Sequence, residues 1–131
     1  MKTNSIHKEI WINAPVEKAF ASFTNAESML AWHGKEVEVN PVPGGIYKVI
    51  FADGTTILGE YKEVSPYSRV IYSANYNGVD SLITIDFLPR DGGTLIKLQQ
   101  EFDPEQDTSS FDQGWNYFLQ ILQDHFGELK A

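Results

Sequence analysis

Between Lys35 and Phe102, apolar residues recur at every second position in six short stretches, and turn-forming residues interrupt them at regular intervals. The interruptions are Pro41–Gly45, Asp53-Gly54, Ser65-Pro66, Asn77-Gly78 and Asp91–Gly93. Period two is the side-chain repeat of a β-strand, and short turns rich in Gly, Asn and Asp join antiparallel neighbours. The pattern therefore predicts an antiparallel meander of six strands, over Lys35–Asn40, Ile46–Ala52, Thr56–Val64, Arg69–Tyr76, Ser81–Leu88 and Thr94–Phe102.

One parity of these strands is apolar and the other is polar, so one face of the sheet is expected to be buried. The apolar parity holds Tyr47, Val49, Phe51, Gly59, Tyr61, Val70, Tyr72, Ala74, Ile83, Ile85, Phe87, Ile96, Leu98 and Phe102. Gln100 shares this parity, although an amide that is buried without a partner costs about 1–3 kcal/mol. We therefore expect Gln100 to have a hydrogen-bond partner inside.

Helices are expected before and after the meander in the sequence. Ile6, Ile10 and Ile12 share a parity that predicts a first strand, after which Asn13 is expected to cap a short helix. A second short helical segment is expected from Ala26 to Trp32. After the last strand, Ser110 or Asp112 is expected to cap a long helix that reaches about Leu129, with an apolar stripe of Phe111, Trp115, Phe118, Leu119, Leu122, Phe126 and Leu129.

This order of elements predicts an α+β fold, in which a seven-stranded antiparallel sheet curves around the long C-terminal helix. Two short helices are expected between the first and second strands. Because 131 residues is the length of one ordinary domain, residues 1–131 are expected to form a single domain. Bulky side chains on the long helix are expected to separate it from the curved sheet and leave a space between helix and sheet.

Composition narrows the classes of partner. The chain has 10 Lys and Arg against 18 Asp and Glu, and its basic residues are scattered singly, so nucleic-acid binding is not expected. It has no cysteine, which removes thiol catalysis and zinc–cysteine sites, and we expect no cofactor. With no signal-like segment and no apolar run near ~18 residues, a cytoplasmic chain without membrane insertion is expected.

Five segments resemble a known family in order along the chain. They are Ile12–Phe20, Trp32, Pro43-Gly44-Gly45, Gly59–Pro66 and Gln113–Asn116. In these segments the chain resembles the START-like, birch-pollen-allergen (SRPBCC) superfamily, in the branch named after the activator of the heat-shock-protein-90 ATPase. The resemblance implies the helix-grip fold and a cavity between sheet and helix, which in many relatives binds apolar small molecules. The co-chaperone that names the branch has a separate chaperone-binding domain, so its activity is not carried over.

The candidate ligand-binding residues lie on the expected inner face and on the helix stripe opposite. Pockets for small molecules are usually built from aromatic walls with a few polar groups. The candidates are Trp32, Tyr47, Phe51, Tyr61, Tyr72, Ile85, Gln100, Trp115, Leu119 and Leu122. The alternative is a filled core, in which the tyrosine hydroxyls bond the backbone. Gly114 is expected to let the long helix approach its neighbour closely.

No motif for a nucleophile, a phosphate loop or a metal is visible, and no catalytic residue is assigned. His125 borders the apolar stripe and is expected to be a buried structural histidine, with an acid–base role as the alternative. His33 is expected at a solvated helix end, with an entrance to a pocket as the alternative. The leading function is binding of an apolar or amphipathic small molecule. The alternatives are an enzyme of cyclase or hydrolase-like type and a protein-interaction module such as a homodimer.

Overall fold

In the computed structural model, which describes residues 4–127, seven strands form one sheet with three helices beside it. The strands are β1 (Asn4–Ile12), β2 (Glu36–Val39), β3 (Ile46–Ile50), β4 (Thr56–Ser65), β5 (Arg69–Tyr76), β6 (Val79–Arg90) and β7 (Gly93–Phe102). The helices are α1 (Val16–Thr24), α2 (Ala26–Leu30) and α3 (Ser109–Gly127). Neighbouring strands are antiparallel in the order β1-β7-β6-β5-β4-β3-β2, which confirms the predicted α+β architecture.

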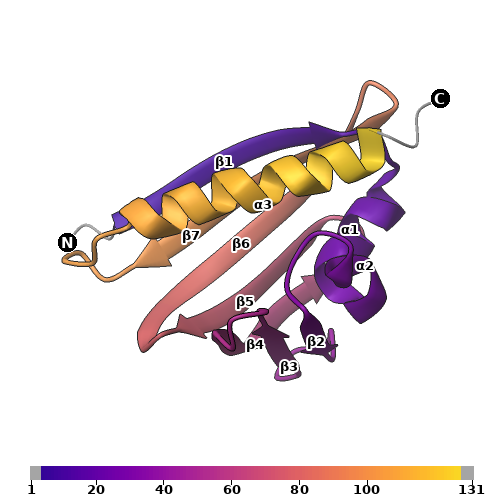
Figure 1. Ribbon diagram of the computed structural model, residues 1–131. Coiled ribbons are helices and arrows are strands. Elements are labelled where there is room, and N and C mark those ends of the chain that lie inside the picture. Colours follow the sequence, from indigo (N-terminus) through magenta and orange to yellow (C-terminus); the bar gives the residue numbers. More distant parts are fainter. Residues whose placement is uncertain (1–3, 128–131) are drawn as a thin grey trace.

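The long helix α3 lies over only the β1–β7 edge of this sheet. Figure 1 shows α3 running along β1 and β7, while the strands from β5 to β2 curve away from it. Gln123 donates a side-chain hydrogen bond to the Trp11 carbonyl (2.8 Å), and Lys8 forms an ion pair with Asp112, so α3 is attached to β1 near both of its ends. Helices α1 and α2 close one end of the sheet, where α1 contacts β6 and β7 and α2 contacts β2. This is the predicted helix-grip arrangement.

Part of the curvature is built into β4. A Cβ at Gly59 would lie 1.8 Å from the backbone oxygen of Ser73 on β5, so only glycine permits this approach. Two residues later the pairing register of β4 with β5 shifts between Tyr61 and Glu63. Such a β-bulge bends the strand and increases its twist, which turns β4 and its neighbours away from α3.

The predicted inner face is confirmed by burial. The inward residues are almost completely shielded from solvent: Tyr47, Val49, Tyr61, Val70, Tyr72, Ala74, Ile83, Ile85, Phe87, Ile96, Leu98, Gln100 and Phe102. Phe51 is only partly buried, because it lies just beyond the end of β3. The polar residues of the opposite parity are exposed or partly buried, as the Arg69–Asp86 ion pair illustrates.

The predicted start of the first helix was wrong in detail. Helix α1 begins at Val16 after an extended Pro15 (φ −68°, ψ 163°), and no side chain caps it. Asn13 therefore lies too early to act as the cap. The corner is held instead by the buried hydroxyl of Thr94, which donates to the Ala14 carbonyl at 2.8 Å.

The ends of the other two helices also differ from the prediction. Helix α2 ends at Leu30 rather than at Trp32. Helix α3 begins at Ser109, whose backbone N–H and hydroxyl both donate to the Asp107 carboxylate (3.0 and 2.7 Å), so neither Ser110 nor Asp112 caps it. Leu129 of the predicted stripe lies outside the described residues. Within residues 4–127, no helix is long and apolar enough to cross a bilayer.

Candidate functional site

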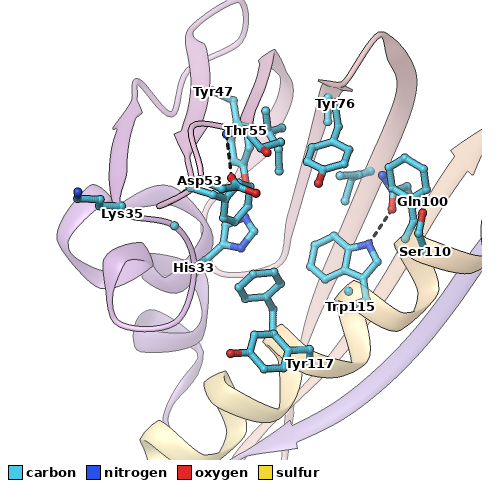
Figure 2. A pocket seen from close by; sticks show the side chains of 18 of the residues that line it. His33, Lys35, Tyr47, Asp53, Thr55, Tyr76, Gln100, Ser110, Trp115 and Tyr117 are labelled. Atoms are coloured by element: carbon cyan, nitrogen blue, oxygen red, sulfur yellow. Dashed lines mark hydrogen bonds between the residues drawn. The ribbon is translucent and has the colours of Figure 1, made fainter.

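A cavity of about 600 Å³ lies between the concave face of the sheet and the first half of α3 (Figure 2). Its sheet wall comes from β3, β4, β5, β6 and β7, and includes Tyr47, Tyr72, Ala74, Ile83 and Gln100. Its helix wall comes from α3, and includes Phe111, Gly114, Trp115 and Phe118. The space exists because α3 is attached to β1 while the far strands curve away from it.

The charged groups of the cavity are confined to its rim. Lys35 in the loop before β2 and Asp53 in the β3–β4 hairpin are both exposed. The backbone N–H of Thr55 donates to the Asp53 carboxylate at 2.9 Å, and this bond lowers the pKa of that carboxyl. Tyr117 on α3 is 65% exposed and completes the rim. A molecule that enters between the hairpin and α3 therefore passes polar groups before it meets the aromatic interior.

One polar group of the wall is a hydrogen-bonded chain through Gln100, and Figure 2 shows its first bond, between Trp115 and Gln100. The Trp115 indole N–H donates to the amide oxygen of Gln100 at 2.7 Å. The amide nitrogen of Gln100 then donates to the Ser81 hydroxyl at 2.8 Å, and that hydroxyl donates to the Ala74 carbonyl at 3.3 Å. The buried amide thus has the partner that the sequence predicted, and the bond holds the indole across the back of the cavity.

A second polar group is formed by two stacked tyrosines. The rings of Tyr47 and Tyr72 lie with centroids 4.0 Å apart at 19°, and the Tyr47 hydroxyl donates a long hydrogen bond of 3.4 Å to the Tyr72 oxygen. Burial raises the pKa of both phenols above the ordinary value, so both stay protonated near neutral pH. In the described part of the chain the Tyr72 hydroxyl has no acceptor for its own proton, so it remains a free donor in the cavity wall.

The third polar group is His33, which the structure places in an aromatic cluster. Its ring stacks on Trp32 (centroids 4.5 Å, 21°) and meets Phe51 and Phe118 edge to face (5.3 and 5.0 Å). The Trp115 ring is nearly parallel to it, 6.4 Å away. Burial lowers the pKa of the imidazole to about 3, so it is neutral near pH 7. Nδ1 is buried and has no hydrogen-bond partner among residues 4–127.

The structure brings five of the ten candidate residues together in the cavity wall. These are Tyr47, Phe51, Tyr72, Gln100 and Trp115. The other five, Trp32, Tyr61, Ile85, Leu119 and Leu122, are buried away from the cavity. Whether any of the ten binds a ligand stays a prediction.

The five that miss the cavity belong to the packed core at its closed end. The Tyr61 hydroxyl donates to the Phe23 carbonyl of α1 (2.9 Å), and the Trp32 indole donates to the Ser22 carbonyl of the same helix (3.0 Å). The Trp32 ring also stacks on that of His33. Ile85 is two residues beyond Ile83 along β6, in the direction of α1. On α3, Leu119 and Leu122 belong to the later half of the helix, beyond the part that borders the cavity.

Three sequence-based expectations were wrong here. His33 is 5% exposed rather than solvated, because the β3–β4 hairpin and α3 cover it. His125 is exposed rather than buried, in the last turn of α3. Gly114 makes no close approach, since a Cβ built there would meet nothing within 4 Å and would point into open space.

Several cavity residues were not among the candidates, although some carried a signal. Ala74 and Ile83 share the inward parity, and Phe111 and Phe118 lie on the apolar stripe of α3. His33 carried no comparable signal, because periodicity does not extend into the loop between α2 and β2. No three potential metal-binding His, Asp or Glu side chains come together within the described range 4–127.

Comparison with known proteins identifies the family. The family model described as Activator of Hsp90 ATPase homolog 1-like protein matches residues 13–127. A search of curated protein sequences gave no match. Among solved structures, CalU16 from Micromonospora echinospora is 24% identical with a TM-score of 0.79, over 92% of this chain and 74% of that one.

Two further structures match over almost their whole length. Protein MLL2253 from Mesorhizobium loti is 20% identical with a TM-score of 0.85, and covers 98% of this chain and 99% of its own. The Aha1 dimer from Colwellia psychrerythraea is 19% identical with a TM-score of 0.80, over the same shares of the two chains. Identities this low show the fold alone. The family match, which spans most of the sequence, shows that the chain belongs to the Activator of Hsp90 ATPase homolog 1-like family of the SRPBCC superfamily.

Proposed function

We propose that this protein binds an apolar or amphipathic small molecule in the cavity between the sheet and α3. The observation that carries the proposal is an aromatic cavity of about 600 Å³ that no side chain of residues 4–127 fills. This volume falls within the range of small-molecule sites, roughly 300–1,000 Å³.

The polar groups of the wall support binding with a defined orientation. The Tyr72 hydroxyl is a free donor, and the bond to Gln100 fixes the indole of Trp115 in place. A few fixed polar groups in an apolar pocket orient a ligand, while the surrounding rings provide most of the contact area. Both features point to a molecule with a flat apolar body and at least one polar substituent.

Acid–base catalysis is the weaker alternative. A general acid or base works best with a pKa near the working pH. The pKa of His33 is lowered to about 3 by burial, and the pKa values of Tyr47 and Tyr72 are raised by burial, so all three keep one protonation state near neutral pH. An enzyme of cyclase or hydrolase-like type would need a group that titrates nearer to neutral pH.

A blocking variant tests the proposal. Gly114→Leu places a side chain into open cavity space, whereas Gln113→Leu adds the same group at the neighbouring exposed position outside the cavity. The probe is N-phenyl-1-naphthylamine, a neutral aromatic dye whose fluorescence rises in apolar surroundings. We expect binding to wild type and to Gln113→Leu, with affinity at least about tenfold weaker in Gly114→Leu, because a filled site loses its ligand contacts.

Native mass spectrometry of the purified wild-type protein would complement the titration. A stoichiometric adduct that is lost on unfolding would give the chemical class of the bound molecule. If wild type does not bind the dye, or if Gly114→Leu binds it as well as Gln113→Leu does, the proposal is wrong.

We also propose that residues 1–131 act as one domain that forms a homodimer. Support for pairing comes from the Colwellia psychrerythraea structure of the same fold, which is described as a dimer. Sedimentation velocity over a wide concentration range tests this, with a mass near twice 14.8 kDa as the expected result. A monomer at all concentrations would contradict it.

A further inference from the structure

We propose that His33 determines which ligands the cavity accepts: its neutral imidazole hydrogen-bonds an uncharged hydroxyl or carbonyl group on an aromatic ligand, and the site discriminates against carboxylates. This inference rests on the proposed binding function and names the class of ligand for the same cavity. The argument depends on the environment of His33, the charges near it and the donor on the opposite wall.

The first observation is an unsatisfied polar group in the wall of the cavity. His33 is 5% exposed, it lines the cavity, and its buried Nδ1 has no hydrogen-bond partner among residues 4–127. The large majority of buried polar side-chain atoms in proteins are paired, so an unpaired one needs an explanation. A ligand group that bonds the imidazole supplies the missing partner.

The second observation is that packing alone does not require a histidine here. The neighbours of the ring are Trp32, Phe51, Trp115 and Phe118, all of which contact it through aromatic faces or edges. A phenylalanine would make the same kinds of contact without a buried polar atom. The nitrogen atoms therefore weaken the packing of the free protein, and their use lies in what the cavity binds.

The third observation concerns charge. The described cavity wall has charged side chains only at the rim, where Lys35 and Asp53 are exposed, and His33 stays uncharged because it is buried. A carboxylate held deep in the cavity would lose its hydration without gaining a cation. An uncharged hydroxyl or carbonyl avoids this penalty.

The Tyr72 hydroxyl extends the same pattern. Its proton has no acceptor in the described structure, so it is free to donate to a ligand oxygen. Figure 2 shows His33 and Trp115 facing the same space between the sheet and α3, with Tyr47 above them. A flat ligand in this space meets aromatic rings on its sides and uncharged hydrogen-bonding groups at its edge.

Three probes that share one ring system test the proposal. Naphthalene has no polar group, 1-naphthol adds an uncharged hydroxyl, and 1-naphthoate adds a carboxylate. Dissociation constants are measured by calorimetry at neutral pH for wild type, His33→Phe and His125→Phe. His125→Phe is the matched control, because it makes the same substitution at an exposed position of α3 outside the cavity.

We expect wild type to bind 1-naphthol about five- to tenfold more tightly than naphthalene, which is the effect of one net hydrogen bond. His33→Phe should lose this difference and bind naphthalene about as well as wild type does. His125→Phe should behave like wild type. The affinity of wild type for 1-naphthoate should be at least about tenfold lower than for 1-naphthol, because the buried carboxylate lacks a cation.

The failure of this inference differs from the failure of the proposed function. If none of the three probes binds and the neutral dye does not bind either, the binding function itself is wrong. If the probes bind but wild type does not distinguish 1-naphthol from naphthalene, or His33→Phe keeps the difference, the role of His33 is wrong. If 1-naphthoate binds as tightly as 1-naphthol, the exclusion of carboxylates is wrong. The comparison of probes on wild type needs no variant, so it stands even if His33→Phe fails to fold.

Discussion

The buried imidazole of His33 makes the stability of this protein depend on pH in a way that one substitution removes. Burial lowers the pKa of His33 from 6.5 to about 3 in the folded protein. In the unfolded chain the imidazole returns to its ordinary pKa and binds a proton below about pH 6.5. His33 therefore leaves the free energy of unfolding unchanged above that pH and lowers it as the pH falls towards 3, because only the unfolded state takes up the proton.

The size of the effect follows from the same two pKa values. Below pH 6.5, each pH unit lowers the free energy of unfolding by about 1.4 kcal/mol, because the unfolded chain binds one more proton than the folded protein. From pH 6.5 to pH 5, which is about 1.5 units, His33 therefore lowers the free energy of unfolding by about 2 kcal/mol. Burial of the ring is the cause of the pKa shift. His33→Phe has no proton to gain and should not show this loss.

Urea unfolding followed by circular dichroism, at several pH values from about 7.5 down to 5, measures the difference. All other ionisable groups are the same in wild type and His33→Phe, so their contributions cancel when the two proteins are compared. We expect His33→Phe to gain about 2 kcal/mol relative to wild type on going to pH 5. The control His125→Phe should follow wild type. Parallel curves for wild type and His33→Phe would refute the reasoning.

Three further substitutions test the packing around the cavity, each by urea unfolding at neutral pH. Gln100→Leu should cost about 1–3 kcal/mol, because the buried indole N–H of Trp115 loses its acceptor; an unchanged stability would mean that this bond contributes nothing. Gly114→Ala should raise stability by about 0.5–1 kcal/mol, since the added methyl group meets only open space inside a helix; destabilisation would show that the space is occupied. Gly59→Ala should cost at least about 2 kcal/mol, because its Cβ would overlap the backbone of Ser73; a neutral effect would contradict the close approach of β4 and β5.

Much of the fold could be predicted because strands and their turns are local patterns. The parity of β3, β5 and β7 was enough to place Tyr47, Tyr72 and Gln100 on the inner face, and the structure confirms this placement. The need of a buried amide for a partner was also predictable, since it follows from desolvation alone. The identity of that partner, Trp115 on α3, required the docking of the helix.

The helix ends were harder to predict, because several polar residues near each end are chemically suited to cap. Asn13 has the right side chain, but the chain remains extended through Pro15 before α1 begins. At α3 the contacts come from Asp107, which precedes both predicted caps. These choices depend on the path of the incoming chain, which a local pattern does not contain.

The sequence by itself determined which side of each strand faces inward, because alternation of apolar and polar residues is a property of the strand alone. Only the tertiary structure decided how far along that face each residue lies, which is why Tyr72 lines the cavity while Tyr61, with the same parity, packs under α1. It also decided that His33 is buried, since the groups that cover it come from a hairpin and a helix distant in sequence. The burial of His33 and the cavity both result from the same arrangement, in which α3 is attached to β1 while the far strands bend away from it. No local sequence pattern encodes the separation between α3 and those strands.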